Sequence, residues 1–244
     1  MFSTGIAVEQ QAAWSSTRNR AAAAPQSRAL DGWFAHAPVH QLKSQQPLFA
    51  EGDIKSSVFR VESGAVLIYR ILNDGYRQVV RFAFPGDFVG LEFEDTHAHD
   101  AQAIGPTRVR CVPAPWLMRR AAEDPELARE LYRSLSCDVL GAHDHLFMIG
   151  RLNATGRLAS FLITLSQRNA QMGLDPVNIS LPVRRCDIAD FLCVSVETVS
   201  RSLAELKLAR IVSLAGWRQI KLLNWHALAD MAAGAQPPQL RYAA

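Results

Sequence analysis

Glu197 and Arg201, four residues apart near the start of a predicted helix, are the residues of this chain best suited to specific recognition. Arg binds guanine through two hydrogen bonds and Glu accepts one from cytosine N4, so the pair can distinguish base pairs in a major groove. Ser195 is suited to cap the helix, although Thr198 stands where Glu or Gln would complete a capping box. An ordinary amphipathic helix with an exposed Glu/Arg pair has the same spacing. The neighbouring segments must decide between these interpretations.

The segments on either side of this helix predict a winged helix-turn-helix. Residues 184–192 form a short helix with an apolar stripe, and a tight turn follows at residues 193–194. Two short helices joined by such a turn, the second with a polar face, make a helix-turn-helix. Residues 211–222 alternate around a Gly-containing turn, which is typical of a β-hairpin and here of a wing. The combination favours DNA binding over an ordinary surface helix.

Charge is distributed unevenly along the chain. Residues 151–222 carry ten Lys and Arg against five Asp and Glu, a net charge of +5, whereas residues 1–150 carry fifteen against seventeen. A basic C-terminal module is expected to contact phosphates, which adds salt dependence without specifying sequence. The candidates for base contact are Glu197, Ser200 and Arg201, and those for backbone contact are Arg184, Arg185, Ser195, Thr198, Lys207, Arg218 and Lys221.

The first half of the chain has a different pattern. After a tail over residues 1–28, short β-like runs fill residues 29–122, and Asn73-Asp74-Gly75 between two of them predicts a hairpin. Many short strands at near-regular spacing indicate a sandwich or a jelly-roll barrel. We therefore expect an α+β protein: an N-terminal β-barrel, a long helix, a winged helix-turn-helix over residues 151–230 and a tail over residues 231–244.

The long helix is predicted over residues 123–150. Its hydrophobic residues recur every three or four positions and form one stripe, namely Leu127, Leu131, Leu135, Val139, Ala142, Leu146 and Ile149. A stripe of this length needs a partner helix, unless it packs on the chain's own barrel. We expect a coiled-coil homodimer, because helix-turn-helix proteins commonly bind two half-sites with two copies.

Composition excludes several other classes of function. No apolar run approaches the roughly 20 residues that span a bilayer, and the N-terminus lacks the pattern of a signal peptide, so we expect a cytoplasmic protein. Four cysteines are widely spread without a CxxC pair, which predicts free thiols. No nucleophile, base and orienting group occur at motif spacing, so the sequence gives no support to an enzyme. Metal ligation by His97 and His99 beside Asp95 and Asp100 is weakly supported, and a solvated loop is favoured.

Beyond the tail, the chain resembles the CRP/FNR family of bacterial transcription regulators over nearly its whole length. The motifs that carry the resemblance are PLFAEGD at 47–53, VFRVESG at 58–64, PGDFVG at 85–90, DIADFL at 187–192 and VETVSR at 196–201. The last resembles the FNR side of the family, which implies Arg201 on guanine, Glu197 on the opposite cytosine and Ser200 toward thymine. The implied target is an inverted TTGAT repeat with half-sites about one helical turn apart. The resemblance also implies activation through RNA polymerase, with the loops at 73–75 and 84–87 as candidate contacts.

The resemblance bears on the effector as well. Members that bind cyclic AMP hold its phosphate with an Arg-Ser pair, where this chain has His99-Asp100, and a carboxylate repels phosphate. Iron–sulphur members need several cysteines in the N-terminal tail, but none precedes Cys111 here, so one subunit cannot build a four-thiolate cluster. The chain thus resembles the FixK-like branch, which acts in oxygen-responsive regulation, and no cofactor is expected. The alternative is a sensor whose barrel binds haem, a gas or another small molecule that gates DNA binding.

Two cysteines are candidates for redox control. Cys186 begins the first helix of the helix-turn-helix beside Arg184 and Arg185, and a helix N-terminus with adjacent cations favours a thiolate. Oxidation there would add negative charge near DNA phosphate; an inert small residue is the alternative. Cys193 stands at the turn position where the family usually has glycine, and a left-handed conformation would cost it about 1 kcal/mol.

Overall fold

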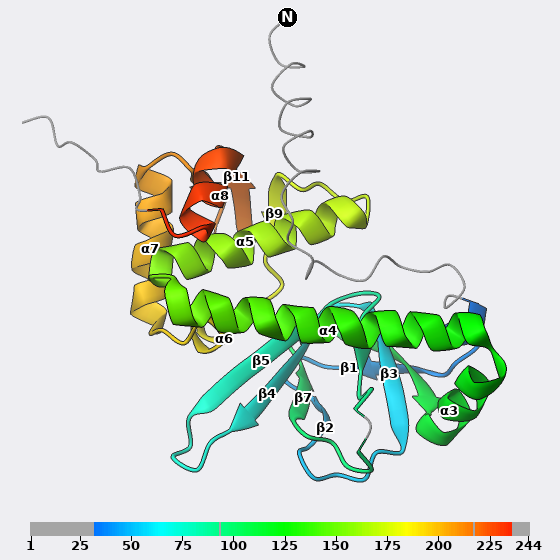
Figure 1. The fold of residues 1–244 in the computed structure, drawn as a ribbon. Coiled ribbons are helices and arrows are strands. Elements are labelled where there is room, and N and C mark those ends of the chain that lie inside the picture. The colour runs from blue at the N-terminus through cyan, green and yellow to red at the C-terminus, as the bar shows by residue number, and fades with distance from the viewer. Residues whose placement is uncertain (1–31, 93, 217, 236–244) are drawn as a thin grey trace, which may run out of the picture. The chain divides into compact units, whose positions relative to one another are not determined.

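The computed structural model describes residues 32–92, 94–216 and 218–235 (Figure 1). Its strands are β1 (Val39–Leu42), β2 (Pro47–Phe49), β3 (Ser57–Ser63), β4 (Val66–Ile71), β5 (Arg77–Ala83), β6 (Phe88–Val89), β7 (Asp100–Ala103), β8 (Thr107–Pro113), β9 (Asn178–Ser180), β10 (Val212–Leu214) and β11 (Gln219–Leu222). Its helices are α3 (Ala114–Glu123), α4 (Pro125–Arg151), α5 (Ala154–Gln171), α6 (Arg185–Leu192), α7 (Val196–Leu208) and α8 (Trp225–Ala232). The predicted tail over residues 1–28 lies outside the described residues.

The described residues form two compact units. One, here called the barrel unit, comprises residues up to 139 together with 182–196. The other, the helical unit, comprises residues 140–181 and those from 197 onward. The boundary falls inside the predicted helix-turn-helix, because α6 belongs to the barrel unit and α7 to the helical unit. The predicted domain bounds, with the helix-turn-helix domain over residues 151–230, stay a prediction.

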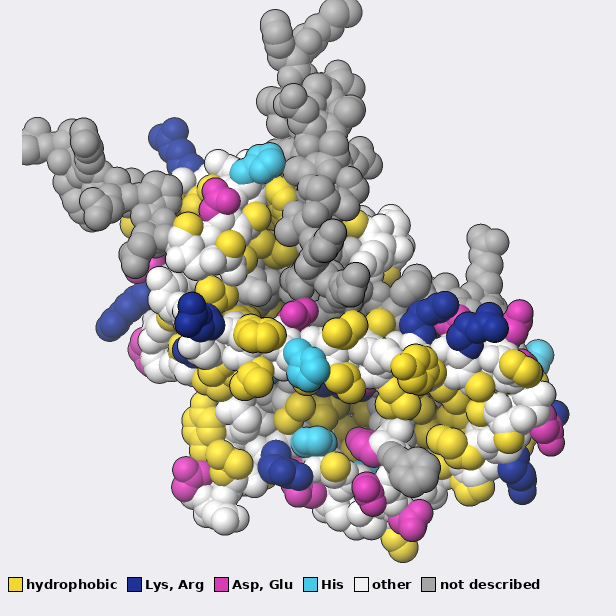
Figure 2. All heavy atoms as spheres, in the orientation of Figure 1, with side chains coloured by type: hydrophobic (Ala, Val, Ile, Leu, Met, Phe, Trp, Pro, Cys, Tyr) yellow, Lys and Arg dark blue, Asp and Glu magenta, His cyan; other side chains and the backbone are white. Residues whose placement is uncertain are grey.

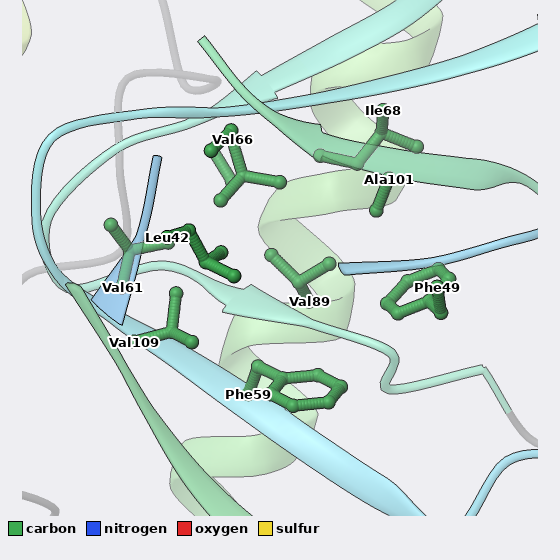
Figure 3. Close-up of a cluster of buried hydrophobic side chains, with 11 residues drawn as sticks. Leu42, Phe49, Phe59, Val61, Val66, Ile68, Val89, Ala101 and Val109 are labelled. Carbon is green, nitrogen blue, oxygen red and sulfur yellow. The ribbon is translucent and has the colours of Figure 1, made fainter. Parts of the chain in front are cut away.

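Two antiparallel sheets make up the barrel. Their strand orders are β1-β8-β3-β6 and β2-β7-β4-β5, which confirms the predicted β-barrel. The inward residues are aliphatic and aromatic, so the interior is filled by side chains such as Phe59, Val66 and Val109 (Figure 3). Close packing of this kind contributes the hydrophobic stabilisation of the barrel.

Two glycines shape the connections of β4. Gly64, between β3 and β4, has a φ of +83°, and a Cβ there would lie 2.6 Å from the carbonyl oxygen of Pro106. Gly75 closes the β4–β5 hairpin with a φ of +81°, and its N–H donates to the carbonyl of Leu72 at 2.8 Å. Only glycine adopts these conformations without strain. The hairpin predicted from Asn73-Asp74-Gly75 is thus confirmed.

A second core lies where α3 and the first turns of α4 cover the β1-β8-β3-β6 sheet. Leu127 and Leu131 are buried there with Phe34, Phe88 and Leu117. The prediction that Leu127 and Leu131 face a partner helix is therefore wrong, because the chain's own barrel covers them. The helix α3 had no clear signal in the sequence.

The helical unit is built on α5. Helix α8 packs against α5, and the hairpin β10–β11 is extended by β9 into a three-stranded sheet of order β10-β11-β9. The register pairs Val212 with Leu222 and Ile220 with Ile179, so the predicted wing is present with an additional strand. Helix α8 continues into the region predicted as a tail, and residues 236–244 lie outside the described part. No helix among the described residues is long and apolar enough to cross a membrane.

Candidate DNA-binding site

Helix α7 carries the three residues predicted to contact bases. Of the apolar residues that periodicity placed on one side, Val199, Leu203 and Leu206 are buried, whereas Val196 in the first turn is exposed. Glu197 and Arg201 are exposed one turn apart, and Ser200 is half-buried beside them. The structure thus leaves on one side of α7 an acceptor and a cation that can reach base edges. Of the other candidates on this helix, Thr198 is half-buried and Lys207 is exposed.

Contacts with α5 fix the buried side of α7. The hydroxyl of Thr155 donates to Glu205 Oε2 at 2.6 Å and lies 3.0 Å from Ser202 Oγ. Thr155 belongs to the first turn of α5, which Asn153 caps by accepting from the N–H of Gly156 at 2.8 Å. Because buried polar groups cost free energy unless they are hydrogen-bonded, this cluster favours one orientation of α7 on α5. No local pattern in the sequence indicates this cluster.

The wing carries two more of the candidate phosphate contacts. Arg218 and Lys221 are both exposed, and Lys221 pairs in register with Asn178 of β9 and Ser213 of β10. Exposed cations on a hairpin suit contact with phosphate oxygens, which positions a protein on DNA without specifying sequence. They stay candidates for that role.

In the barrel unit, α6 begins with a pair of arginines and a buried carboxylate. The backbone N–H of Arg184 donates to Asp187 Oδ2 at 3.3 Å, and its Nε donates to the same oxygen at 2.9 Å. Burial raises the pKa of Asp187, but the hydrogen bonds and charges of Arg184 and Arg77 outweigh it and leave the pKa below its usual value. Arg184 and Arg185 are half-buried and stay candidates for phosphate contact. Ser195, which follows α6, is exposed.

Cys193 ends α6 in a left-handed conformation, with φ 53° and ψ 49°. The turn therefore keeps the conformation that glycine favours although cysteine occupies it. The amide of Gln78 lies 3.4 Å from the Cys193 sulphur, which gives the thiol a polar partner. Cys186, the other redox candidate, is half-buried with its sulphur 3.9 Å from Asp187 Oδ1. All four cysteines are free thiols.

Comparison with known proteins identifies the family. Residues 156–231 match the Crp-like helix-turn-helix domain, and residues 39–124 match the cyclic nucleotide-binding domain. The nitrogen fixation regulation protein FixK of Azorhizobium caulinodans is 35% identical over 182 residues, which cover 74% of this chain and 73% of that protein. The chain belongs to the CRP/FNR family. It is accordingly a DNA-binding transcription regulator and not an enzyme.

Other CRP/FNR proteins match over a similar length. The fumarate and nitrate reduction regulatory protein of Yersinia pestis is 32% identical over 198 residues, covering 80% of this chain and 79% of that protein. The structure of FixK2 from Bradyrhizobium japonicum superposes with a TM-score of 0.76 at 34% identity, covering 82% of this chain and 99% of that one. The fold and the FixK-like resemblance predicted from sequence are confirmed.

The stretch between β6 and β7 differs from the predicted solvated loop. His97 is only 3% exposed, and its ring stacks on Phe49 with centroids 3.5 Å apart. Its Nδ1 lies 3.7 Å from Glu92 Oε2, and neither atom has a hydrogen-bond partner. The solvated-loop prediction is wrong for His97, because an aromatic partner inside the barrel unit was not evident from local polarity. Among the described residues, no group of three or more His, Cys, Asp or Glu is arranged to hold a metal.

Proposed function

We propose that this CRP/FNR regulator binds an inverted repeat of TTGAT half-sites as a homodimer and acts without a cyclic nucleotide or an iron–sulphur cluster. It controls oxygen-responsive genes, mainly as an activator that contacts RNA polymerase. The observation that carries the proposal is the exposure of Glu197 and Arg201 one turn apart on α7, whose other side is fixed to α5. A guanidinium and a carboxylate at this spacing suit a guanine and a neighbouring cytosine.

The apolar surface of α4 supports the homodimer. Tyr132, Leu135, Val139 and Leu146 are exposed, and with Ala142 and Ile149 they are spaced alternately by three and four residues. That spacing averages 3.5 residues, the period of a left-handed coiled coil of two helices. Figure 2 shows hydrophobic side chains along the outward side of α4. Monomeric proteins seldom expose an apolar stripe of this length to solvent. We therefore expect α4 of a second copy of the chain to bury it.

The residues between β6 and β7 do not fit a cyclic nucleotide. A bound phosphate needs cations or free N–H donors, whereas this stretch contains the carboxylates of Glu92, Asp95 and Asp100. Asp100 accepts a hydrogen bond from the N–H of Glu51 at 3.1 Å, and Arg70 pairs with Glu51 at 3.0 Å. The His97 ring occupies the space beside Gly90, where a Cβ would lie 3.1 Å from His97 Cε1. These features support action without that ligand.

The names of the relatives support the regulatory context. FixK of Azorhizobium caulinodans is a nitrogen fixation regulation protein, and the Yersinia pestis relative regulates fumarate and nitrate reduction. Both processes belong to growth with little oxygen, and we propose the same setting for this chain. The β4–β5 turn at residues 73–75 is exposed, as a contact with RNA polymerase requires.

A binding-site selection on random duplexes, with protein free of metal and nucleotide, tests the proposal. We expect recovery of an inverted TTGAT repeat with half-site centres about ten base pairs apart. Recovery only after addition of haem, a gas or another small molecule would contradict ligand independence and favour the sensor alternative. Recovery of single, unpaired half-sites would contradict the dimer.

A further inference from the structure

Strand β5 of the barrel holds α6, the first helix of the helix-turn-helix, through a charged clamp. Arg77, the first residue of β5, donates from Nη2 to Asp187 Oδ1 at 2.7 Å and from Nε to Asp190 Oδ2 at 2.8 Å. Asp187 and Asp190 are one turn apart on α6, so one planar guanidinium bridges the same side of the helix twice. Figure 1 shows α6 beside β5.

Two further residues of β5 extend this contact toward the end of α6. The side-chain amide of Gln78 donates to the carbonyl oxygen of Asp190 at 3.1 Å and lies 3.4 Å from the Cys193 sulphur. Phe82 packs on Phe191, with ring centroids 5.2 Å apart. The carbonyls in the last turn of a helix lack intrahelical partners, so the Gln78 amide satisfies one of them. The clamp therefore fixes both the start and the end of α6.

The side chains of the clamp are largely buried, unlike those of an ordinary surface ion pair. Asp187 is fully buried, and the side chains of Arg77 and Asp190 are about three-quarters covered. Loss of Arg77 would leave the buried Asp187 with the guanidinium of Arg184 and would remove the Arg77 guanidinium from Asp190, and loss of a partner from a buried ion pair is destabilising. Arg77 and Asp187 are 110 residues apart in sequence, so the contact joins the barrel to the DNA-binding motif.

We propose that Arg77, supported by Gln78 and Phe82, is a positioning residue for DNA recognition. The first helix of a helix-turn-helix crosses the DNA backbone and sets how the second helix enters the groove. Here α6 is held by the barrel, α7 is held by Thr155 of α5, and only residues 193–195 connect the two helices. A protein whose α6 is released spends less time in the geometry that binds DNA. The inference rests on DNA binding by the family and not on the TTGAT sequence.

The test compares Arg77→Gln with Arg70→Gln on a duplex that the wild type selects from a random pool. Arg70 is a matched control, because it is a partly exposed arginine of the adjacent strand β4 and pairs with Glu51 rather than α6. If loss of the clamp reduces the competent fraction about tenfold, the Kd of Arg77→Gln rises about tenfold, whereas that of Arg70→Gln stays within about twofold. Hydrogen exchange of the α6 amides should accelerate in Arg77→Gln and stay unchanged in Arg70→Gln.

The salt dependence of binding separates positioning from direct contact. Arg77 faces carboxylates, so Arg77→Gln should keep the wild-type slope of log Kd against log salt, whereas loss of a phosphate contact lowers that slope by about one. Equal affinity in Arg77→Gln and Arg70→Gln, tighter binding by Arg77→Gln, or a reduced slope would each overturn the proposal. If Arg77→Gln does not fold, Gln78→Met serves in its place and should weaken binding in the same direction. Failure of the wild type to select any duplex would instead refute the proposed DNA target.

Discussion

Leu131 and Tyr132 are neighbours in α4 but face different surroundings, with 6% and 73% of their surfaces exposed. Leu131 packs in the second core of the barrel unit, whereas Tyr132 begins the exposed stripe that continues through Leu135, Val139 and Leu146. The helix therefore has two apolar sides with two different partners. One is the chain's own barrel, and the other, on our account, is a second copy of the chain.

Leu146→Asp should dissociate the dimer. A carboxylate within an apolar coiled-coil seam has no partner, and the dimer dissociation constant should rise by about a hundredfold, which corresponds to roughly 3 kcal/mol. Leu146 is 68% exposed in the single chain, so its folding should be little affected. Sedimentation velocity over a concentration series measures the change. Met118→Asp, at an exposed apolar position of α3, is the control and should stay dimeric; equal behaviour of both variants would refute the α4 seam.

Thr155→Val should destabilise the helical unit. The change keeps a β-branched side chain but removes the hydroxyl that bonds Glu205 and Ser202, which should lower the free energy of unfolding by about 1–2 kcal/mol. Urea unfolding followed by circular dichroism measures it. Thr164→Val in the same helix removes only a bond back to the carbonyl of Ser160 and should cost no more than about 0.5 kcal/mol. Equal losses of unfolding free energy in the two variants would show that the hydrogen bonds of Thr155 to α7 do not stabilise the helical unit.

The barrel should become less stable as pH falls below about 6.5, the ordinary pKa of histidine. Burial lowers the pKa of His97, against opposing effects of Glu92 and Asp53, and the charge of Lys55 lowers it further. Below about pH 6.5 the unfolded chain therefore binds a proton at this histidine before the folded chain does. The free energy of unfolding accordingly rises with pH up to about 6.5 and decreases as the pH falls below it. Burial also lowers the pKa of His99, which adds to the dependence of stability on pH.

Unfolding midpoints measured between pH 5 and 8 test this prediction. The midpoint should depend less steeply on pH in His97→Phe, and as steeply as in the wild type in His40→Gln, at an exposed position. Identical slopes in all three proteins would show that His97 does not cause the pH dependence.

Peroxide should weaken DNA binding through Cys186. Peroxide oxidises this half-buried thiol to a sulfenic acid with loss of water, which adds bulk and, when ionised, negative charge beside Arg184 and Arg185, at a helix start expected near phosphate. The wild type should lose affinity on treatment and regain it with a thiol reductant, whereas Cys186→Ser should be insensitive. Cys193→Ser is the control for the second candidate thiol and should respond to peroxide as the wild type does. Loss of DNA binding by peroxide-treated Cys186→Ser would contradict this role for Cys186.

The elements predicted most accurately depend on signals close together in sequence. Apolar residues at helical spacing after Ser195 predict α7, and Asn73-Asp74-Gly75 specifies the β4–β5 hairpin. Features that depend on distant partners were not predicted. Periodicity predicts that Leu131 is buried, but not that the chain's own barrel buries it. The polar residues around His97 likewise do not indicate that its ring stacks on Phe49. For the same reason the pairing of Arg77 with Asp187 had no signal in either local segment.

A cycle of protein and DNA changes determines whether Arg201 binds the guanine of each half-site. Wild type and Arg201→Ala are each titrated, by fluorescence anisotropy at fixed salt, against the TTGAT duplex and the same duplex with 7-deazaguanine, which lacks the N7 acceptor. We expect each single change to raise the Kd at least about fivefold, because a bidentate contact contributes about 1–3 kcal/mol. The second change should then add little to the first. Independent, multiplicative losses, or an Arg201→Ala protein with wild-type affinity and sequence preference, would contradict it.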